Sequence, residues 1–363
     1  MNHQQKPWRI VVILGSLWAA VLSIPTRGAE PATPVRGVLV RAQRVTPEFL
    51  NEWKAKGARS VVVVLDESVK KEWPPLARMV AARGMDLWAW VEVARNPAMA
   101  DAHPEWVASL GGHHDDWRKR FPDAPRGRSG EGIKAWPWVP IGYTAAYHAH
   151  RARIESLLAN LPGSWSGVFL NDLQTGPSSC GCGNDQCRWA LDYGTPATAA
   201  KSPGDDAAAR LVGDIRKANP GKAVVPVWVE ECEPIDLPGA PGGTGLCGGV
   251  GCARGDCWPR NARAWNPLHA AGGPIALGVW SETFKRDPDR WIDSNIKLFQ
   301  NQPAGAAALE PDRTIAVVEA WGLGDRALAA RLATVARFAP GWLLALDPIE
   351  QSWKPILMPA KGK

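Results

Sequence analysis

Short runs of apolar residues, most of them β-branched or aromatic, recur along the chain and alternate with stretches whose apolar residues have helical spacing. Runs of this length and composition are typical of buried β-strands. We expect eight strands, over residues 37–41, 60–66, 87–93, 167–172, 224–230, 275–282, 314–319 and 342–347.

Helical segments are predicted between these strands. Residues 46–57 open with Thr46-Pro47-Glu48, a favourable helix start, and residues 145–161 carry apolar side chains at helical spacing. Residues 205–218 and 325–338 show the same pattern. Eight strands alternating with helices are typical of a (β/α)8 TIM barrel, a fold of class α/β.

The predicted barrel forms a single domain over residues 35–353. Three loops interrupt it: a long insertion after the third strand and Cys-rich loops after the fourth and fifth strands. Residues 354–363 are expected to be a C-terminal tail.

The first 29 residues are set apart from the barrel. Lys6 and Arg9 precede an apolar run over residues 10–24, the pattern of a secretory signal peptide. The run is shorter than the roughly 18 to 20 apolar residues of a spanning helix, although an uncleaved anchor is the alternative. We therefore predict export to the periplasm or the extracellular space, with no membrane association after cleavage.

Charge excludes one class of partner. Cleavage would remove three basic residues and no acid, and so lower the formal net charge of +6 by three. The remaining basic residues are scattered, with the densest cluster at residues 118–120, and form no stripe that would follow a phosphate backbone. We expect no binding to nucleic acid.

A Trp-x-Glu motif ends three predicted strands, and its reverse ends a fourth. The copies are Trp90-Val91-Glu92, Trp228-Val229-Glu230, Trp280-Ser281-Glu282 and, reversed, Glu319-Ala320-Trp321. Residues two apart in a strand share a face, so each motif sets an indole beside a carboxylate. Flat indoles are platforms for pyranose rings, and the chain has twenty tryptophans against three tyrosines. We predict that these four tryptophans bind carbohydrate, while Trp53, Trp165 and Trp342 pack helices on the sheet.

Acidic residues gather where the strands end, the edge at which barrel enzymes carry their functional groups. A single strand-end acid usually caps the next helix or pairs with an arginine. A cluster of acids raises some pKa values by mutual repulsion, which favours general acid catalysis. Besides the catalytic candidates named below, the predicted substrate-binding polar residues are Asp66, Glu92, Asn171 and Glu231.

At these strand ends the chain resembles (β/α)8 glycoside hydrolases, which use two carboxylates. In one of their layouts an Asn-Glu pair on strand four supplies the acid/base and a Glu on strand seven the nucleophile. The matching residues are Asn171-Asp172, with Asp in place of Glu, and Glu319. In the amylase-like layout a strand-four Asp is the nucleophile and a strand-five Glu the acid, which implies Asp172 with Glu230 or Glu231. In many such enzymes the strand-four Asp falls at the position of Asn171.

Asp172 is common to both layouts and is the first catalytic candidate. Its candidate partners are Glu230, Glu282 and Glu319. Two further stretches resemble secreted bacterial proteins: Asp101-Ala-His-Pro-Glu-Trp106 is similar to a segment of glycoside-hydrolase-like barrels, and Cys180-Gly-Cys-Gly-Asn-Asp-Gln-Cys187-Arg-Trp189 looks like a motif of uncharacterised ones. Such likeness bears on fold more than on reaction.

The seven cysteines fall into two groups on neighbouring loops. They are Cys180, Cys182 and Cys187 after strand four, and Cys232, Cys247, Cys252 and Cys257 after strand five. In an exported protein this favours disulfides that join the two loops and leave one thiol over. A structural zinc site is the alternative, although the spacings lack paired Cys-x2-Cys knuckles.

No other metal or cofactor is expected. His113-His114-Asp115-Asp116 lies in the polar insertion, and no histidine ends a strand to join it. That argues against a metal-dependent barrel hydrolase, which is a further alternative.

Two hypotheses about the function of the chain are the leading ones. The first is an exported glycoside hydrolase that acts on a polysaccharide or glycoconjugate by two-carboxylate acid/base catalysis. The second is a barrel that binds glycans without cleaving them. Only catalysis requires two carboxyl groups about 5 to 5.5 Å apart for retention, or roughly 6.5 to 9.5 Å for inversion.

Overall fold

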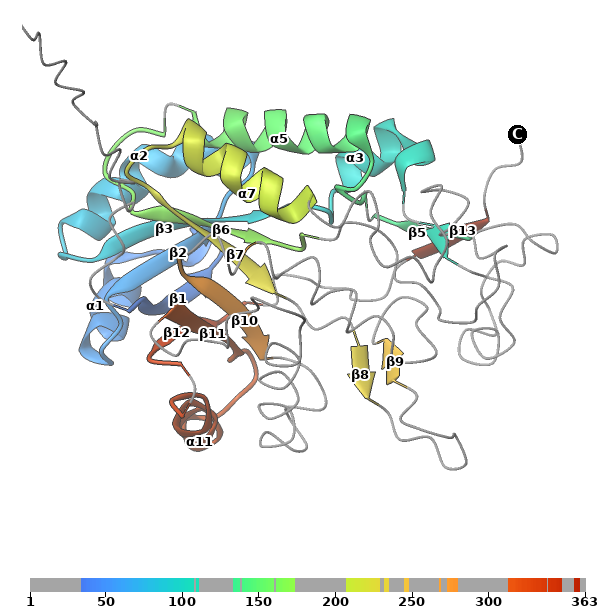
Figure 1. Ribbon diagram of the computed structural model, residues 1–363. Coiled ribbons are helices and arrows are strands. Elements are labelled where there is room, and N and C mark those ends of the chain that lie inside the picture. Colours follow the sequence, from blue (N-terminus) through green and yellow to red (C-terminus); the bar gives the residue numbers. More distant parts are fainter. Residues whose placement is uncertain are drawn as a thin grey trace, which may run out of the picture.

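Eight parallel strands close into a barrel in the computed structural model (Figure 1). The structure describes residues 34–107, 109–110, 133–137, 139–159, 161–173, 207–228, 232–234, 245–247, 268, 273–279, 313–337, 339–347 and 356–359. Around the barrel the order of strands is β1, β12, β11, β10, β7, β6, β3 and β2, which returns to β1. The fold is therefore the predicted (β/α)8 TIM barrel.

Every predicted strand is confirmed, with ends that shift by a few residues. The barrel strands are β1 (Arg36–Val40), β2 (Ser60–Val64), β3 (Asp86–Glu92), β6 (Gly167–Asn171), β7 (Ala223–Trp228), β10 (Ile275–Val279), β11 (Thr314–Glu319) and β12 (Gly341–Ala345). The arrows of β7 and β10 in Figure 1 point to the end of the barrel on whose side β5 and β13 lie. We call the end where the strands terminate the mouth.

Side chains of the barrel strands alternate between an inner and an outer core. The inner core combines two indoles and a phenyl ring with aliphatic side chains; its buried members are Val35, Leu39, Val62, Trp88, Trp90, Phe169, Val225, Val227, Ala276, Ile315, Val317, Leu343 and Ala345. The ring of Phe169 stacks on Trp90 at 5.9 Å and meets Trp88 at 5.4 Å. The β3–β6 side of the barrel is thus filled by aromatic rings.

Gly167 makes room for this packing. A Cβ at this position would lie 2.5 Å from the Trp88 ring and 2.4 Å from the carbonyl oxygen of Ala223. Both distances are far below van der Waals contact, so β6 must begin with glycine for the Trp88 indole to enter the barrel.

The outer core lies between the sheet and the helices. The helices are α1 (Pro47–Ala55), α2 (Glu67–Ala81), α3 (Pro97–Ala102), α5 (Thr144–Leu158), α7 (Ala207–Ala218) and α11 (Asp325–Val335), with short 3-10 turns η1 (Ala42–Arg44) and η2 (Pro104–Trp106). Figure 1 shows α2, α5 and α7 over the β3–β6–β7 side and α11 on the opposite side. As predicted, Trp53, Trp165 and Trp342 pack in the outer core.

Four of these helices match predicted segments, the short α3 matches none, and α2 was not expected either. It contains Pro74 and Pro75, residues that normally interrupt a helix. Fully buried Trp73 and the buried Leu76 and Val80 anchor it on the barrel. Tertiary burial therefore outweighs the local cost of the prolines.

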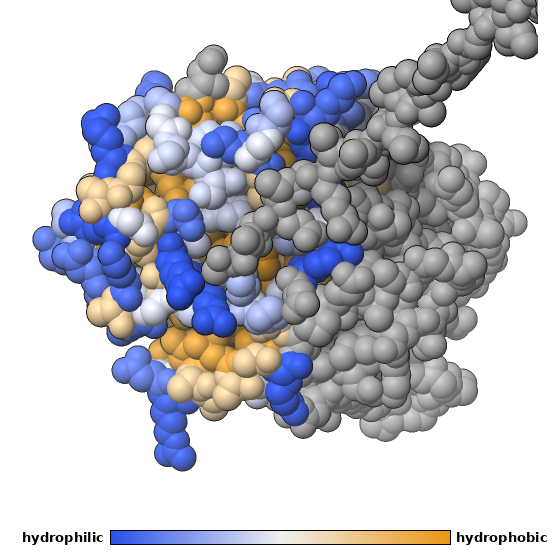
Figure 2. Space-filling view, turned by 60° about the vertical axis from the view of Figure 1, so that its left-hand side comes forward, coloured by the Kyte–Doolittle hydropathy of each residue, from blue (hydrophilic) through white to orange (hydrophobic). Residues whose placement is uncertain are grey.

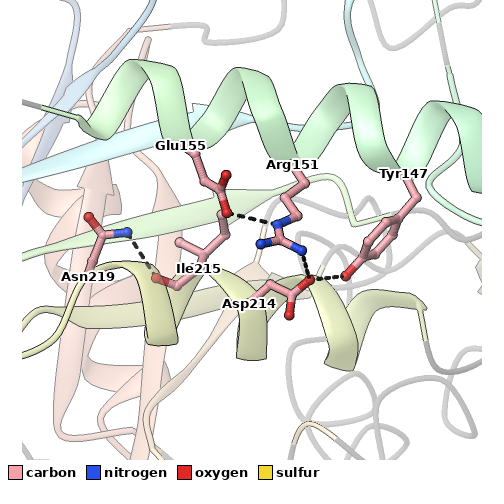
Figure 3. Close-up of polar contacts among 6 residues, drawn as sticks. All are labelled: Tyr147, Arg151, Glu155, Asp214, Ile215 and Asn219. Atoms are coloured by element: carbon pink, nitrogen blue, oxygen red, sulfur yellow. Dashed lines mark hydrogen bonds and ion pairs between the residues drawn. The ribbon is translucent and has the colours of Figure 1, made fainter.

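A polar network joins α5 to α7 (Figure 3). Arg151 donates hydrogen bonds to Glu155 at 2.8 Å on its own helix and to Asp214 of α7 at 2.9 Å. The hydroxyl of Tyr147 donates to the same carboxylate oxygen of Asp214 at 2.9 Å. The network holds the two helices in one layer outside β6 and β7.

Two small antiparallel sheets lie outside the barrel. One is formed by β4 (Ser109–Leu110), β5 (Ile133–Trp136) and β13 (Ile356–Pro359), and the other by β8 (Cys232–Pro234) and β9 (Gly245–Cys247). The insertion after the third barrel strand contributes β4 and β5, and β13 comes from the segment predicted to be a tail. Residues 356–359 are therefore a paired strand, because their backbone pairs with β5 along its whole length.

Figure 2 brings forward the end of the barrel away from the mouth, where hydrophilic residues predominate and apolar ones gather mainly near the lower edge of the view. Within the described ranges no helix has both the length and the apolar character needed to cross a membrane. The predicted signal peptide, residues 1–29, lies outside the described residues.

Candidate active site

Glu92 is the last residue of β3 and stands at the centre of a polar cluster in the mouth. Strand alternation gives it the inner face, above Trp88 and Trp90. The indole Nε1 of Trp90 donates a hydrogen bond to Glu92 Oε1 at 2.7 Å. Asn171 Nδ2 lies 3.0 and 2.9 Å from its two carboxylate oxygens. Because two side chains fix its position, Glu92 has little rotational freedom, yet it stays partly exposed.

The pKa of Glu92 is raised above its ordinary value. Burial is the largest cause, since it penalises the charged carboxylate. Hydrogen bonds from Trp90 and Asn171 and the charges of Arg95 and Arg153 act in the opposite direction, without cancelling it. Glu92 therefore keeps its proton to a higher pH than a solvated glutamate does.

Arg153 connects this cluster to the outer layer. It comes from α5, and its Nη1 donates to the backbone oxygen of Glu92 at 2.9 Å. The contact fixes the end of β3 from outside the barrel. Nothing in the sequence marks Arg153, because it lies within a helix, far from any strand end.

Asn171 ends β6 on the inner face, and Asp172 follows it. Asn171 is the register partner of Glu92 and is buried. Asp172 is also buried and has a φ of 57°, the left-handed region that few residues other than glycine adopt. The backbone carbonyls of both residues accept hydrogen bonds from the turn after β3, from Val93 and Ala94. The inner position at this strand end is therefore held by the amide, as the residue register suggested.

Glu319 and Trp321 lie on the far side of the mouth. Three strands separate β11 from β3 in either direction around the barrel, so the two stand opposite one another. Glu319 has the parity of Ile315 and Val317, which belong to the inner core. Trp321 is partly exposed and packs against that core. These two residues face the Glu92 cluster from across the barrel.

The structure gives other roles to Trp90 and Asp66. Trp90 is 1% exposed, so its ring is part of the core and is closed to a sugar, contrary to the prediction. Asp66 caps α2: its Oδ1 accepts from the backbone nitrogens of Ser68 at 2.8 Å and Val69 at 3.0 Å. Burial raises the pKa of Asp66, but hydrogen bonds from the Ser68 hydroxyl and from these two nitrogens outweigh it and keep the pKa low. Its Oδ1 therefore serves as the cap of α2.

The Trp-x-Glu motif of β7 has the opposite strand parity from the motifs at the ends of β3 and β11. Val225 and Val227 of β7 belong to the inner core, so Trp228 has the opposite parity. The register agrees, because Trp228 pairs with Leu277, a residue of the outer core. By its register, Trp228 therefore does not share the inner face with Glu92 and Glu319. In β7 the inner positions are those of odd number.

Other predicted site residues lie outside the described part of the chain. They are Trp280, Glu230, Glu231, Glu282, Cys180, Cys182, Cys187, Cys252 and Cys257. Cys232 and Cys247 are described by their backbone alone. Among the described residues there is no group of three or more His, Cys, Asp or Glu side chains that could hold a metal ion.

Comparison with known proteins gives only remote likenesses. No protein-family model matches the chain. No curated protein sequence matches it either. Among solved structures, a sugar phosphate isomerase/epimerase from Parabacteroides distasonis is 12% identical with a TM-score of 0.39, over 91% of this chain and 93% of that one. The α-L-fucosidase isoenzyme 2 from Paenibacillus thiaminolyticus is 11% identical with a TM-score of 0.43, over 88% of this chain and 47% of that one.

A third similar structure is a β-galactosidase from Halorubrum lacusprofundi. It is 12% identical with a TM-score of 0.43, over 85% of this chain and 52% of that one. The barrel itself is established by the eight parallel ladders of this chain.

Proposed function

We propose that the protein is an exported glycoside hydrolase whose active site is the barrel mouth. The observation that carries the proposal is Glu92, a partly exposed carboxyl group that burial holds at a raised pKa and that Trp90 and Asn171 fix in place. A proton donor to a glycosidic oxygen needs these properties: a proton retained toward neutral pH, a fixed position and access to substrate.

In this mechanism Glu92 protonates the leaving oxygen as the glycosidic bond breaks. A second carboxylate attacks the anomeric carbon or activates a water for that attack. Glu319 is the partner that the described residues favour, because its strand lies opposite β3. Asp172, Glu230 and Glu282 stay candidates for the same role.

Substrate binding is assigned to Trp321 among the described tryptophans. It is partly exposed, lies two residues after Glu319 and rests on the inner core, which supports the back of the ring. An indole in that position offers a flat apolar face to a pyranose ring. Trp280, which lies outside the described residues, stays a second candidate from the Trp-x-Glu motif.

The test is a screen for hydrolysis. The full chain is incubated with a panel of polysaccharides and oligosaccharides, and release of reducing ends is measured for the wild type, Glu92→Gln, Asp172→Asn and Glu319→Gln. Glu155→Gln is the control, because Glu155 is a carboxylate of the α5–α7 network outside the mouth. We expect turnover by the wild type and the control and strong loss in Glu92→Gln.

The partner variants then assign the second role. A loss as large as that of Glu92→Gln in either Asp172→Asn or Glu319→Gln identifies the second carboxylate, and unchanged turnover removes that residue from the mechanism. Binding without turnover over the whole panel would instead favour a barrel that holds glycans without cleaving them.

A further inference from the structure

Strands β8 and β9 place two cysteines directly opposite each other. The strands pair antiparallel, with Cys232 opposite Cys247, Glu233 opposite Leu246 and Pro234 opposite Gly245. Figure 1 shows this two-stranded sheet outside the barrel. Residues directly opposite in an antiparallel ladder lie on the same face of the sheet.

Pro234 indicates which kind of pair the cysteines form. Opposite residues in an antiparallel ladder alternate between pairs that exchange hydrogen bonds and pairs that exchange none. Proline has no N–H to donate, so the Pro234–Gly245 pair suits the second kind. The Cys232–Cys247 pair lies two positions along the ladder and is therefore of the same kind.

That kind of pair has the closer backbone spacing. The Cα atoms of a non-hydrogen-bonded pair are about 4.5 Å apart. A disulfide spans Cα separations of roughly 4.4 to 6.8 Å. The register thus brings the two residues into bridging range without movement of either strand.

We propose that Cys232 and Cys247 form a disulfide bond. Each thiol loses a proton, and the pair passes two electrons to a disulfide-bonded oxidant, which is reduced to two thiols as the new S–S bond forms. The inference rests on the register of the ladder and is independent of the proposed hydrolase activity.

The bond would close a local hairpin instead of joining two loops, which is what the cysteine grouping alone predicts. The connection it closes, residues 235–244, is rich in glycine and proline. A crosslink across such a segment restricts the unfolded chain and fixes the start of the loop after β7. Five cysteines remain, so the odd thiol has to be sought among Cys180, Cys182, Cys187, Cys252 and Cys257.

Peptide mapping of the oxidised full-length chain tests the bond. The protein is equilibrated with oxidised glutathione, its free thiols are alkylated in denaturant without reduction, and it is digested for mass spectrometry. Trypsin alone leaves Cys232, Cys247 and Cys252 on one peptide, residues 223–254, so a second protease must cut at Asp236, because the bond after Glu233 precedes Pro234 and resists cleavage. We expect linked peptides that contain Cys232 and Cys247 and separate on reduction.

Two variants sharpen the result. Cys247→Ser should make Cys232 reactive to the alkylating reagent, whereas Cys252→Ser should leave the linked pair intact. The proposal fails if Cys232 of the wild type is alkylated or is linked to another cysteine. It also fails if a chelator alone exposes both thiols, which is the signature of bound zinc. If Cys247→Ser does not accumulate, the map of Cys252→Ser decides the matter, because residues 248–251 offer these proteases no cleavage site between Cys247 and Cys252.

Discussion

The β3–β6 sector of the barrel rim and the β12–β1–β2 sector carry acids at the same topological place, yet the acids meet different surroundings. In the second sector Asp66 receives backbone N–H groups at the start of α2, and Asp347 pairs with Arg44 at 2.6 Å. In the first sector Glu92 is held by an indole and an amide and is penalised by burial. In the second sector a helix cap and an ion pair engage the acids, whereas in the first sector burial raises the pKa of Glu92.

The difference shows that position at a strand end does not decide the role of an acid. Backbone N–H groups at a helix start and a guanidinium both favour the charged form of a carboxylate. The donors around Glu92 also favour the charged form, but burial beside the aromatic inner core outweighs them. The surroundings of each acid therefore separate a catalytic candidate from a cap.

The largest effect is expected where the sectors differ in chemistry. Glu92→Gln keeps the size of the side chain and removes the proton donor, so kcat/KM should fall by about 10²- to 10⁴-fold. Asp347→Asn, a change at the other sector, should leave kcat/KM near the wild-type value. The two are compared on a substrate found in the screen, and equal losses in both variants would erase the contrast between the sectors.

The next effect concerns the indole that holds Glu92. Trp90→Phe removes the Nε1 donor, whereas Trp88→Phe removes a similar volume from the same inner core without that loss. In the described part of the chain Trp88 Nε1 makes no hydrogen bond. Trp90→Phe should cost about 1.5 to 3 kcal/mol more in the free energy of unfolding than Trp88→Phe, since the lost hydrogen bond goes to a carboxylate.

Denaturant unfolding of both variants gives the comparison. Equal costs would mean that the Trp90 hydrogen bond contributes nothing measurable and that Glu92 is held by Asn171 alone.

Much of the barrel could be predicted from the sequence, because a buried strand requires a run of apolar residues that is visible in the sequence. All eight strands appear as apolar runs, and the Thr46 cap of α1 is confirmed by its hydrogen bond with the Phe49 nitrogen. Helix α2 could not be predicted, because Pro74 and Pro75 disfavour a helix locally. Only the burial of its apolar side chains on the barrel stabilises it.

The site was predictable in outline and not in its details. Strand ends indicated where Glu92, Asn171 and Glu319 lie, but strand parity cannot be read reliably from a motif. Trp90 shows one way of failing, because its indole is enclosed by Phe169 and the inner core. Arg153 depends on a contact between a helix and a strand end, for which the sequence offers no local signal.

A smaller effect should follow from loss of the α2 cap. Asp66→Ala should cost roughly 0.5 to 2 kcal/mol at neutral pH, and Asp66→Asn much less because asparagine also caps. The pKa of Asp66 is lowered in the folded state, so its contribution is present above its ordinary pKa of 3.8 and is lost as the pH falls through the folded value. The wild type and Asp66→Ala should therefore converge in stability at low pH.

Urea unfolding at neutral and acidic pH measures this convergence, with turnover expected to be unchanged in both variants. A cost that stays constant as the pH falls would show that the cap does not depend on the charge of Asp66.

The smallest effect is expected at the ion pair between Arg44 and Asp347. Arg44 is half-exposed, so water and salt screen the attraction, and Arg44→Gln should cost no more than about 0.2 to 1 kcal/mol. Arg44 also donates to the backbone oxygen of Leu346 at 2.8 Å, and Asp347 keeps a hydrogen bond from the backbone nitrogen of Arg41 at 3.0 Å. The difference between the wild type and Arg44→Gln in thermal unfolding should shrink as salt is added. A cost above that range, insensitive to salt, would mean that this pair closes the barrel between β12 and β1 as firmly as the hydrogen bonds hold Glu92 in the β3–β6 sector.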